Sequence, residues 1–216
     1  MEQASQAILQ DTREQIRTSD AFILAETRRL QTLYALKYEI RYARTRGALD
    51  TESVAEHVYG MLMLIEYFLL LEDEMGAWNH ERIARMALFH DIDEIETGDT
   101  LGYLKTQANI DQERAAAEIV IQKLPALMRE HTHALLDEYE AQETIEARFT
   151  KAIDKIEPLF HLYNKEGKRL LLQNGTTYEQ SERIKRAYIG EFPYMVRFLD
   201  VIHGTMRNEG YFAEEA

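Results

Sequence analysis

Residues 86–99 read MALFHDIDEIETGD, a stretch in which an adjacent histidine and aspartate follow four apolar residues. Asn79 is placed to cap a helix that carries Ile83 and His90 on the same apolar face. The run Thr97-Gly98-Asp99 then breaks the helical pattern. An ionisable group that faces a core is costly unless it is paired or bound to a metal. The stretch therefore predicts a charged site at the end of a core helix.

Two further ionisable side chains stand in apolar sequence on other predicted helices. His57 precedes a long apolar run, and Asp154 is flanked by isoleucines. Together with His90 and Asp91, they make a set of two imidazoles and two carboxylates that can converge from three helices. Such nitrogen and oxygen ligands suit Mn²⁺, Co²⁺, Fe²⁺, Ni²⁺ or Zn²⁺ and do not choose among them.

The same residues also have a structural interpretation. A lone core histidine is more often a hydrogen-bonded packing residue than a ligand. Asp154 could pair with Lys151 one helical turn earlier, a contact worth about 0.2–0.5 kcal/mol. Spacing alone leaves both interpretations open.

The composition limits the kinds of partner. The 216 residues include 38 acidic and 25 basic side chains, for a net charge of −13, and 45% are hydrophobic. This is a foldable composition that argues against binding a nucleic acid polymer or an anionic membrane. The absence of cysteine excludes disulfides and thiolate metal sites. The polar start of the chain and the interruption of residues 58–71 by Glu66 predict a cytoplasmic protein without a membrane span.

The hydrophobic pattern predicts helices from end to end and no strand, which is typical of an all-α fold in a single domain over residues 1–216. Ser53 and Glu56 fit a capping box. A loop is expected over 165–177. Helices are expected over residues 2–17, 19–42, 53–71, 79–96, 110–123, 125–140, 144–165, 177–189 and 192–208.

Three segments in this order resemble the HD-domain phosphohydrolases. Residues 90–99 resemble the signature of that family, and ESVAEHVY at 52–59 is similar to its first metal-histidine motif. Residues 146–157 resemble the helix that bears its last metal aspartate. The order and spacing are most similar to the HD-domain 5′-deoxynucleotidases. The resemblance covers about residues 38–165 and implies a helical HD-domain bundle onto which the terminal helices pack.

The resemblance also implies roles for individual residues. The expected ligands of one divalent ion (Mn, Co, Mg, Fe, Ni or Zn) are His57, His90, Asp91 and Asp154. Glu94 matches the catalytic carboxylate of the family, and Asp99 matches the acid that orients the attacking water. A single ion is favoured because His131 and His133, two residues apart, point to nearly opposite faces of a helix and cannot chelate together.

A substrate-binding pair is expected at Arg41 and Tyr42, where the family has an Arg-Trp pair that holds phosphate and sugar. Arg44 and Arg46 compete for the role of Arg41, and Tyr42 replaces the expected tryptophan. A solvated helix end is the alternative interpretation of this arginine cluster.

The implied activity is removal of the 5′-phosphate from deoxynucleoside monophosphates by a metal-dependent hydrolase. Two alternatives stay open: a nucleoside triphosphohydrolase or pyrophosphatase on the same fold, and a non-catalytic nucleotide or metal sensor. The expected partner is a small nucleotide. A homodimer is also expected, and the aromatic C-terminal helices are candidates for its interface.

Overall fold

The computed structural model describes residues 2–41, 52–99 and 107–214, and within these ranges the chain is all-α, as the sequence predicts. Besides helices, the described residues form only two isolated β-bridges, Ile40–Ser53 and Thr177–Ala213. The 3₁₀ helix η1 follows α2. The elements in chain order are α1 (Glu2–Thr18), α2 (Asp20–Gln31), η1 (Thr32–Lys37), α3 (Val54–Glu72), α4 (His80–Phe89), α5 (Glu94–Thr97), α6 (Gln107–Lys123), α7 (Ala126–Ala141), α8 (Ile145–Leu162), α9 (Lys165–Gln173), α10 (Tyr178–Ile189) and α11 (Pro193–Asn208).

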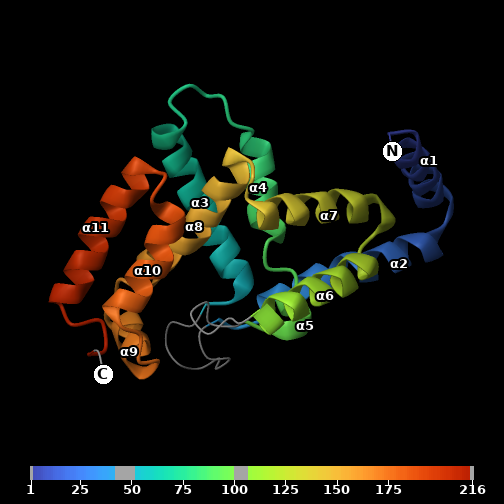
Figure 1. Cartoon of the computed structure of the whole chain (residues 1–216). Helices are drawn as coiled ribbons and strands as arrows, with labels where there is room; N and C mark the ends of the chain where they lie inside the picture. Colours follow the sequence, from blue (N-terminus) through green and yellow to red (C-terminus); the bar gives the residue numbers. More distant parts are fainter. Residues whose placement is uncertain (1, 42–51, 100–106, 215–216) are drawn as a thin grey trace.

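Helix α8 lies at the centre of the larger part of the molecule and packs against α3, α4, α7, α10 and α11 (Figure 1). Phe149, Ile153 and Ile156 of α8 are fully buried in the main hydrophobic core. Each such side chain contributes about 1.5–3 kcal/mol when it is removed from water. This packing fixes α3, α4 and α8, the three helices that carry the predicted ligands.

A second apolar cluster joins α4 to α6, α7 and η1. It contains Met86, Val120, Leu135 and Tyr139, all buried. Helix α1 packs mainly against α2 and α7 and lies at the far end of the molecule from α11 (Figure 1). None of the residues of α2 is buried.

The helix starts that the sequence predicts are confirmed where capping residues mark them. Ser53 and Glu56 form the capping box of α3, with the Ser53 N–H donating to Glu56 Oε2 at 2.6 Å. Asn79 caps α4 by accepting the Arg82 N–H. Such caps contribute about 0.5–2 kcal/mol each.

Three predicted boundaries are wrong. The helix expected over 79–96 ends at Phe89, and a separate short helix, α5, covers Glu94–Thr97. The second helix was expected to run to residue 42, but α2 ends at Gln31 and a 3₁₀ turn continues the chain to Lys37. The expected loop over 165–177 contains α9, which Asn164 caps through the N–H groups of Glu166 and Gly167. Gly167 resembles a helix breaker in the sequence, yet a Cβ there would lie 2.1 Å from the Leu162 carbonyl oxygen. Glycine is therefore needed for the close approach of α9 to α8.

Helix α3 is the one described helix that is long and apolar enough, by length and composition, to cross a membrane. Its buried residues include Met61, Ile65 and Phe68, which belong to the main core between α3, α8 and α11. Helix α3 therefore packs as a core helix of this fold.

The β-bridge between Ile40 and Ser53 joins the segment before α3 to the N-cap residue of that helix.

Candidate metal centre

His57 and His90 meet in the core from two different helices. His57 lies in the first turn of α3, His90 follows the last residue of α4, and their ring centroids are 5.5 Å apart. Nδ1 of His90 donates to the Ala87 carbonyl oxygen at 3.0 Å, and Nδ1 of His57 donates to Glu157 Oε2 at 2.8 Å. Because both Nδ1 atoms serve as donors, each ring in its neutral form presents a lone pair at Nε2. Both Nε2 atoms are buried and lack a hydrogen-bond partner among the described residues.

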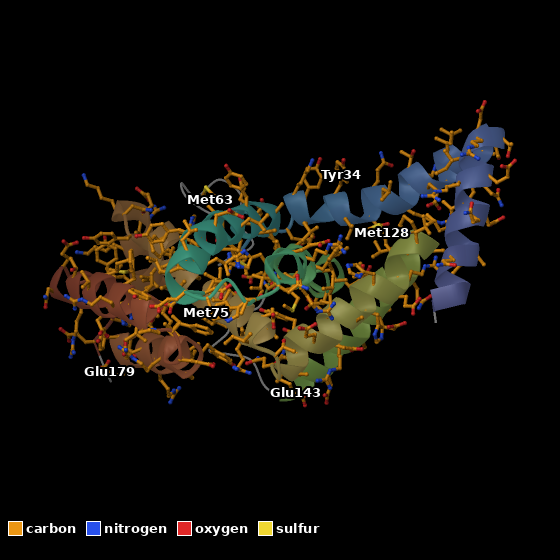
Figure 2. The ribbon with its side chains drawn as sticks, turned by 90° about the horizontal axis from the view of Figure 1, so that it is seen from above. Tyr34, Met63, Met75, Met128, Glu143 and Glu179 are labelled. Carbon is orange, nitrogen blue, oxygen red and sulfur yellow. The ribbon has the colours of Figure 1, made fainter. Side chains whose placement is uncertain are left out.

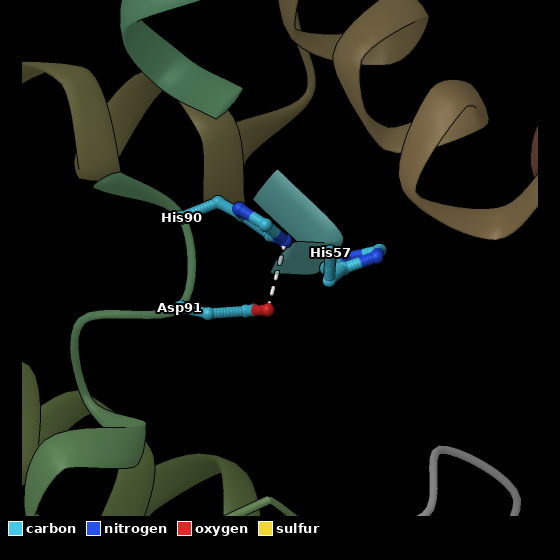
Figure 3. A group of neighbouring side chains, drawn as sticks. All are labelled: His57, His90 and Asp91. Atoms are coloured by element: carbon cyan, nitrogen blue, oxygen red, sulfur yellow. Dashed lines mark ion pairs between the residues drawn. The ribbon is translucent and has the colours of Figure 1, made fainter. Parts of the chain in front are cut away.

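Two carboxylates face these Nε2 atoms. Asp91 Oδ2 lies 3.0 Å from Nε2 of His90, and Asp154 Oδ1 lies 3.5 Å from Nε2 of His57 and 3.8 Å from that of His90. Figure 3 shows His57, His90 and Asp91 meeting from α3 and from the end of α4, and their ligand atoms all lie within 4.8 Å of one another. Neighbouring ligands at about 2.1 Å from one ion are roughly 3.0–3.4 Å apart. The residues present therefore fit a divalent cation, and the predicted four side chains do come together.

Charge in the site favours the ionised carboxylates. Burial alone would raise the pKa of Asp154, but Lys155, whose Nζ lies 2.7 Å from Asp154 Oδ2, and the two imidazoles hold that pKa well below its usual range. Burial likewise opposes ionisation of Asp91, yet the imidazole of His90 lowers its pKa. Deprotonated carboxylates are the form that a cation needs as ligands.

The imidazole of His57 is held by its carboxylate partners. Burial and the nearby Arg41 guanidinium both lower its pKa, whereas the carboxylates of Asp154 and Glu157 raise it, and the net result is a pKa of about 9. The two carboxylates therefore favour a positive charge at Nε2, which either a proton or a bound cation supplies.

Glu94 lies beside this cluster at the start of α5. Its side chain is buried, and its Oε2 has no hydrogen-bond partner among the described residues. Burial, together with the charges of Asp91 and Asp99, raises the pKa of Glu94 well above its usual value. Asp99 follows the break after α5 that the sequence predicts and is half-buried. Burial and like charge therefore favour the protonated form of Glu94 more than they would for an exposed glutamate.

Arg41 is buried in a carboxylate network rather than at a solvated helix end. Its Nη1 donates to Glu52 Oε1 at 2.9 Å and lies 3.7 Å from Glu157 Oε2. His161 reaches the same Glu52, with its Nδ1 3.4 Å from Oε2. Glu52, His57 and Glu157 also form a group with metal-ligand spacing, but the Arg41 guanidinium already supplies the positive charge there. The predicted partner Tyr42, with Arg44 and Arg46, lies outside the described residues.

Gly60 makes room for Glu157. A Cβ at Gly60 would lie 2.7 Å from Glu157 Oε1 and 3.3 Å from its Cδ. Gly60 follows His57 by one helical turn, so the carboxylate occupies the space beside α3 from which it reaches Nδ1 of His57. The glycine therefore permits the contact that orients the imidazole.

Several residues of the site were not singled out from the sequence. Asp154 pairs with Lys155, not with Lys151, which lies over the Tyr139 ring and 3.9 Å from Glu140. The Tyr139 hydroxyl donates to Asp154 Oδ2 at 3.1 Å. One feature of the sequence could have identified Glu157, since it is a carboxylate that follows Asp154 by one helical turn among apolar residues. Nothing in the local sequence marks Tyr139.

The fold and this cluster define a class of protein. A family model described as HD domain matches residues 33–195, and the chain therefore belongs to the HD-domain family. Among curated proteins, it is 35% identical over 108 residues to the 5′-deoxynucleotidase HDDC2 of Xenopus laevis, covering 49% of this chain and 51% of that protein. It is 32% identical over 114 residues to the 5′-deoxynucleotidase HDDC2 of Homo sapiens, covering 52% of this chain and 53% of that protein. The chain spans about half the length of the curated relatives it matches.

Solved structures show the same architecture over most of the chain. A predicted metal-dependent phosphohydrolase from Magnetospirillum magnetotacticum superposes with a TM-score of 0.73 and 27% identity, covering 89% of this chain and 98% of that one. An HD-domain phosphohydrolase from Listeria innocua superposes with a TM-score of 0.53 and 21% identity, covering 83% and 97%, and shows the fold alone. The all-α HD-domain fold expected from the motifs is thus confirmed.

Proposed function

We propose that the protein is a metal-dependent phosphomonoester hydrolase that removes the 5′-phosphate from deoxynucleoside monophosphates. The observation that carries the proposal is the pair of buried Nε2 atoms of His57 and His90, which face Asp91 and Asp154 and lack another partner among the described residues. The similarity to the 5′-deoxynucleotidases HDDC2 of Xenopus laevis and Homo sapiens supports the choice of substrate.

The four side chains His57, His90, Asp91 and Asp154 would hold one divalent ion. Such an ion, when bound, acidifies a water molecule and neutralises phosphate oxygens. Carboxylate and imidazole ligands admit Mn²⁺, Co²⁺, Mg²⁺, Fe²⁺, Ni²⁺ or Zn²⁺, so the ion has to be identified by assay.

The remaining roles follow from burial and charge. Burial and the nearby charge of Asp91 raise the pKa of Glu94, so its carboxyl group would deliver a proton to the leaving 5′-oxygen. Asp99 would orient the attacking water. Arg41, fixed by Glu52, would bind the phosphate with its guanidinium, which suits two oxygens at once. Tyr42 is proposed to contact the sugar.

A phosphate-release screen tests the activity. The purified protein is given deoxynucleoside monophosphates, ribonucleoside monophosphates and deoxynucleoside triphosphates with Mn²⁺, Co²⁺ and Mg²⁺ in turn. We expect inorganic phosphate from the deoxynucleoside monophosphates. Pyrophosphate or tripolyphosphate from triphosphates would indicate triphosphohydrolase chemistry, and no product with any substrate would indicate a sensor.

Metal content tests the ligand set separately. His57→Ala and Asp154→Ala should each lower the metal retained on elemental analysis, with Glu66→Ala on the exposed side of α3 as the control. Unchanged metal in both ligand variants would contradict the proposed centre, whatever the activity.

We also propose one folding domain over residues 1–216, a cytoplasmic location and a homodimer. Of the aromatic residues of the C-terminal helices, Tyr194 is exposed, whereas Phe192 is buried within the chain. Exposed apolar side chains are also present on η1 and α3, where Tyr34 and Met63 lie along one edge of the molecule (Figure 2). Light scattering after gel filtration should give a dimer mass, and Met63→Glu should shift it toward the monomer.

A further inference from the structure

A cavity lies next to the metal centre, between α8, α9, α10 and α11. It offers about 140 Å³ to the centres of water-sized molecules. This is roughly ten times the space that one water needs, so the cavity can admit a small organic ring but not a polymer. Asp154 and Arg41 form part of its wall, which places it directly against the proposed catalytic residues.

Lys185 of α10 points its ammonium group into this region. Its Nζ donates to the Lys155 carbonyl oxygen at 2.8 Å, and this is its only polar contact among the described residues. Burial, followed by repulsion from Lys155, lowers the pKa of Lys185 to about 8. An ammonium group that is partly removed from water and pairs with no carboxylate is disfavoured, and an anionic ligand would stabilise it.

The other cationic groups on this wall already have partners. Lys155 is paired with Asp154 at 2.7 Å, and Arg41 is paired with Glu52 at 2.9 Å. Lys185 is therefore the cation on this wall that forms no ion pair with a carboxylate among the described residues. Its Nζ contacts the carbonyl of Lys155, the residue after Asp154, so a phosphate bound by Lys185 would lie close to the proposed metal ligands.

The rest of the cavity suits a flat, mostly apolar ring with a polar edge. Its walls combine large apolar side chains with a few uncharged polar groups. Among the polar groups, the Asn174 amide has no hydrogen-bond partner among the described residues. Apolar walls with a few placed polar groups are typical of small-molecule sites. The lining includes Leu162, Leu170, Leu171, Met206, Phe212, Asn174 and Ser181.

We propose that this cavity receives the nucleoside part of a deoxynucleoside monophosphate and that Lys185 binds its phosphate together with Arg41. The assignment rests on the proposed function, because it takes the substrate class from there. Under this assignment the C-terminal helices form part of the substrate site. Lys185 becomes a substrate-binding residue on α10, a helix that carries none of the predicted site residues.

Binding measured without turnover tests the proposal. Full-length protein stripped of metal with a chelator is titrated with each deoxynucleoside monophosphate and its deoxynucleoside by ligand-observed NMR, which reaches weak affinities. Lys185→Met should weaken monophosphate binding about tenfold or more, since it removes a charged hydrogen bond, and should leave deoxynucleoside binding within about twofold. Lys165→Met, at the exposed start of α9, is the matched control and should change neither.

A second variant tests the shape of the cavity without changing its charge. Leu170→Trp narrows the cavity and should weaken both ligands, while thermal unfolding confirms that the variant is folded. In the metal-loaded enzyme, Lys185→Met should raise KM with a smaller effect on kcat. Wild-type binding by both variants, or no binding of any monophosphate to the wild type with or without metal, would overturn the assignment. Lys185-dependent binding without phosphate release would instead keep the assignment and contradict the proposed hydrolase.

Discussion

Oε2 of Glu157 lies 2.8 Å from Nδ1 of His57, a contact between side chains 100 residues apart in the sequence. The carboxylate accepts a hydrogen bond from Nδ1–H and so leaves Nε2 facing Asp154. Groups that hold the far nitrogen of a ligating histidine fix both its tautomer and its orientation. The contact thus connects the buried carboxylate network around Arg41 to the proposed metal centre.

Loss of this contact should weaken metal binding. Glu157→Ala is expected to lower affinity for the divalent ion by about 10–100-fold, the usual effect of removing a group that orients a ligand. Competition with a chromophoric chelator measures the affinity. Glu66→Ala on the exposed face of α3 is the control, and equal affinity in the two variants would show that Glu157 has no orienting role.

Gly60→Ala should impair the centre without unfolding the protein. Alanine favours a helix by about 1 kcal/mol over glycine, but the new Cβ would lie 2.7 Å from Glu157 Oε1 and displace that side chain. We expect metal affinity to fall while the urea midpoint changes little. Gly204→Ala in α11, where a Cβ meets nothing within 4 Å, is the matched control. Equal metal affinity in Gly60→Ala and wild type would show that displacement of Glu157 does not affect metal binding.

The sequence alone was sufficient to predict that the proposed ligands lie close together. Helical periodicity placed His57, His90 and Asp154 on apolar faces, and the caps Ser53 and Asn79 marked where two of the helices begin. Core packing then leaves few ways to arrange three such helices. The roles of these residues in binding metal are still predictions that the experiments above test.

The residues that surround and orient the proposed ligands could not be predicted from local sequence patterns. Glu157 and Lys185 reach the site only because α8 packs against both α3 and α10. The need for glycine at position 167 also depends on packing between helices, because α9 approaches α8 too closely there for any side chain. Contacts between helices distant in sequence decide these positions, and propensity alone does not report them.

Glu94→Ala should separate metal binding from turnover. Glu94 is buried and holds a raised pKa, but it is not one of the proposed ligands, so the variant should retain metal while losing most phosphate release. General acid–base groups typically contribute about 10²–10⁴-fold to a rate. Initial rates and metal content are measured on the same samples, with Glu96→Ala on the exposed side of α5 as the control. Phosphate release at the wild-type rate would contradict a proton-transfer role.

The stability of the fold should fall on mild acidification, and His203 should account for part of the loss. His203 is fully buried on α11, with Nδ1 2.8 Å from Glu182 Oε2 and Nε2 3.0 Å from the Ser181 hydroxyl. Burial lowers its pKa below 6.5, although the hydrogen bond to Glu182 opposes this, and Lys185 adds to the lowering. The unfolded chain then binds a proton at a higher pH than the folded chain. Stability is therefore complete above about pH 6.5 and declines as the pH falls through the folded pKa, by about 1.4 kcal/mol per pH unit at most.

His203→Gln removes this titration, at the cost of a weaker Glu182 contact at every pH. Urea unfolding at about pH 7.5 and about pH 5.5 should show a smaller acid-induced loss of unfolding free energy in His203→Gln than in wild type. The exposed His133 on α7 provides the control, and His133→Gln should keep the wild-type loss. An identical loss in all three proteins would mean that His203 takes up its proton equally in the folded and unfolded chains, so that other groups cause the acid sensitivity.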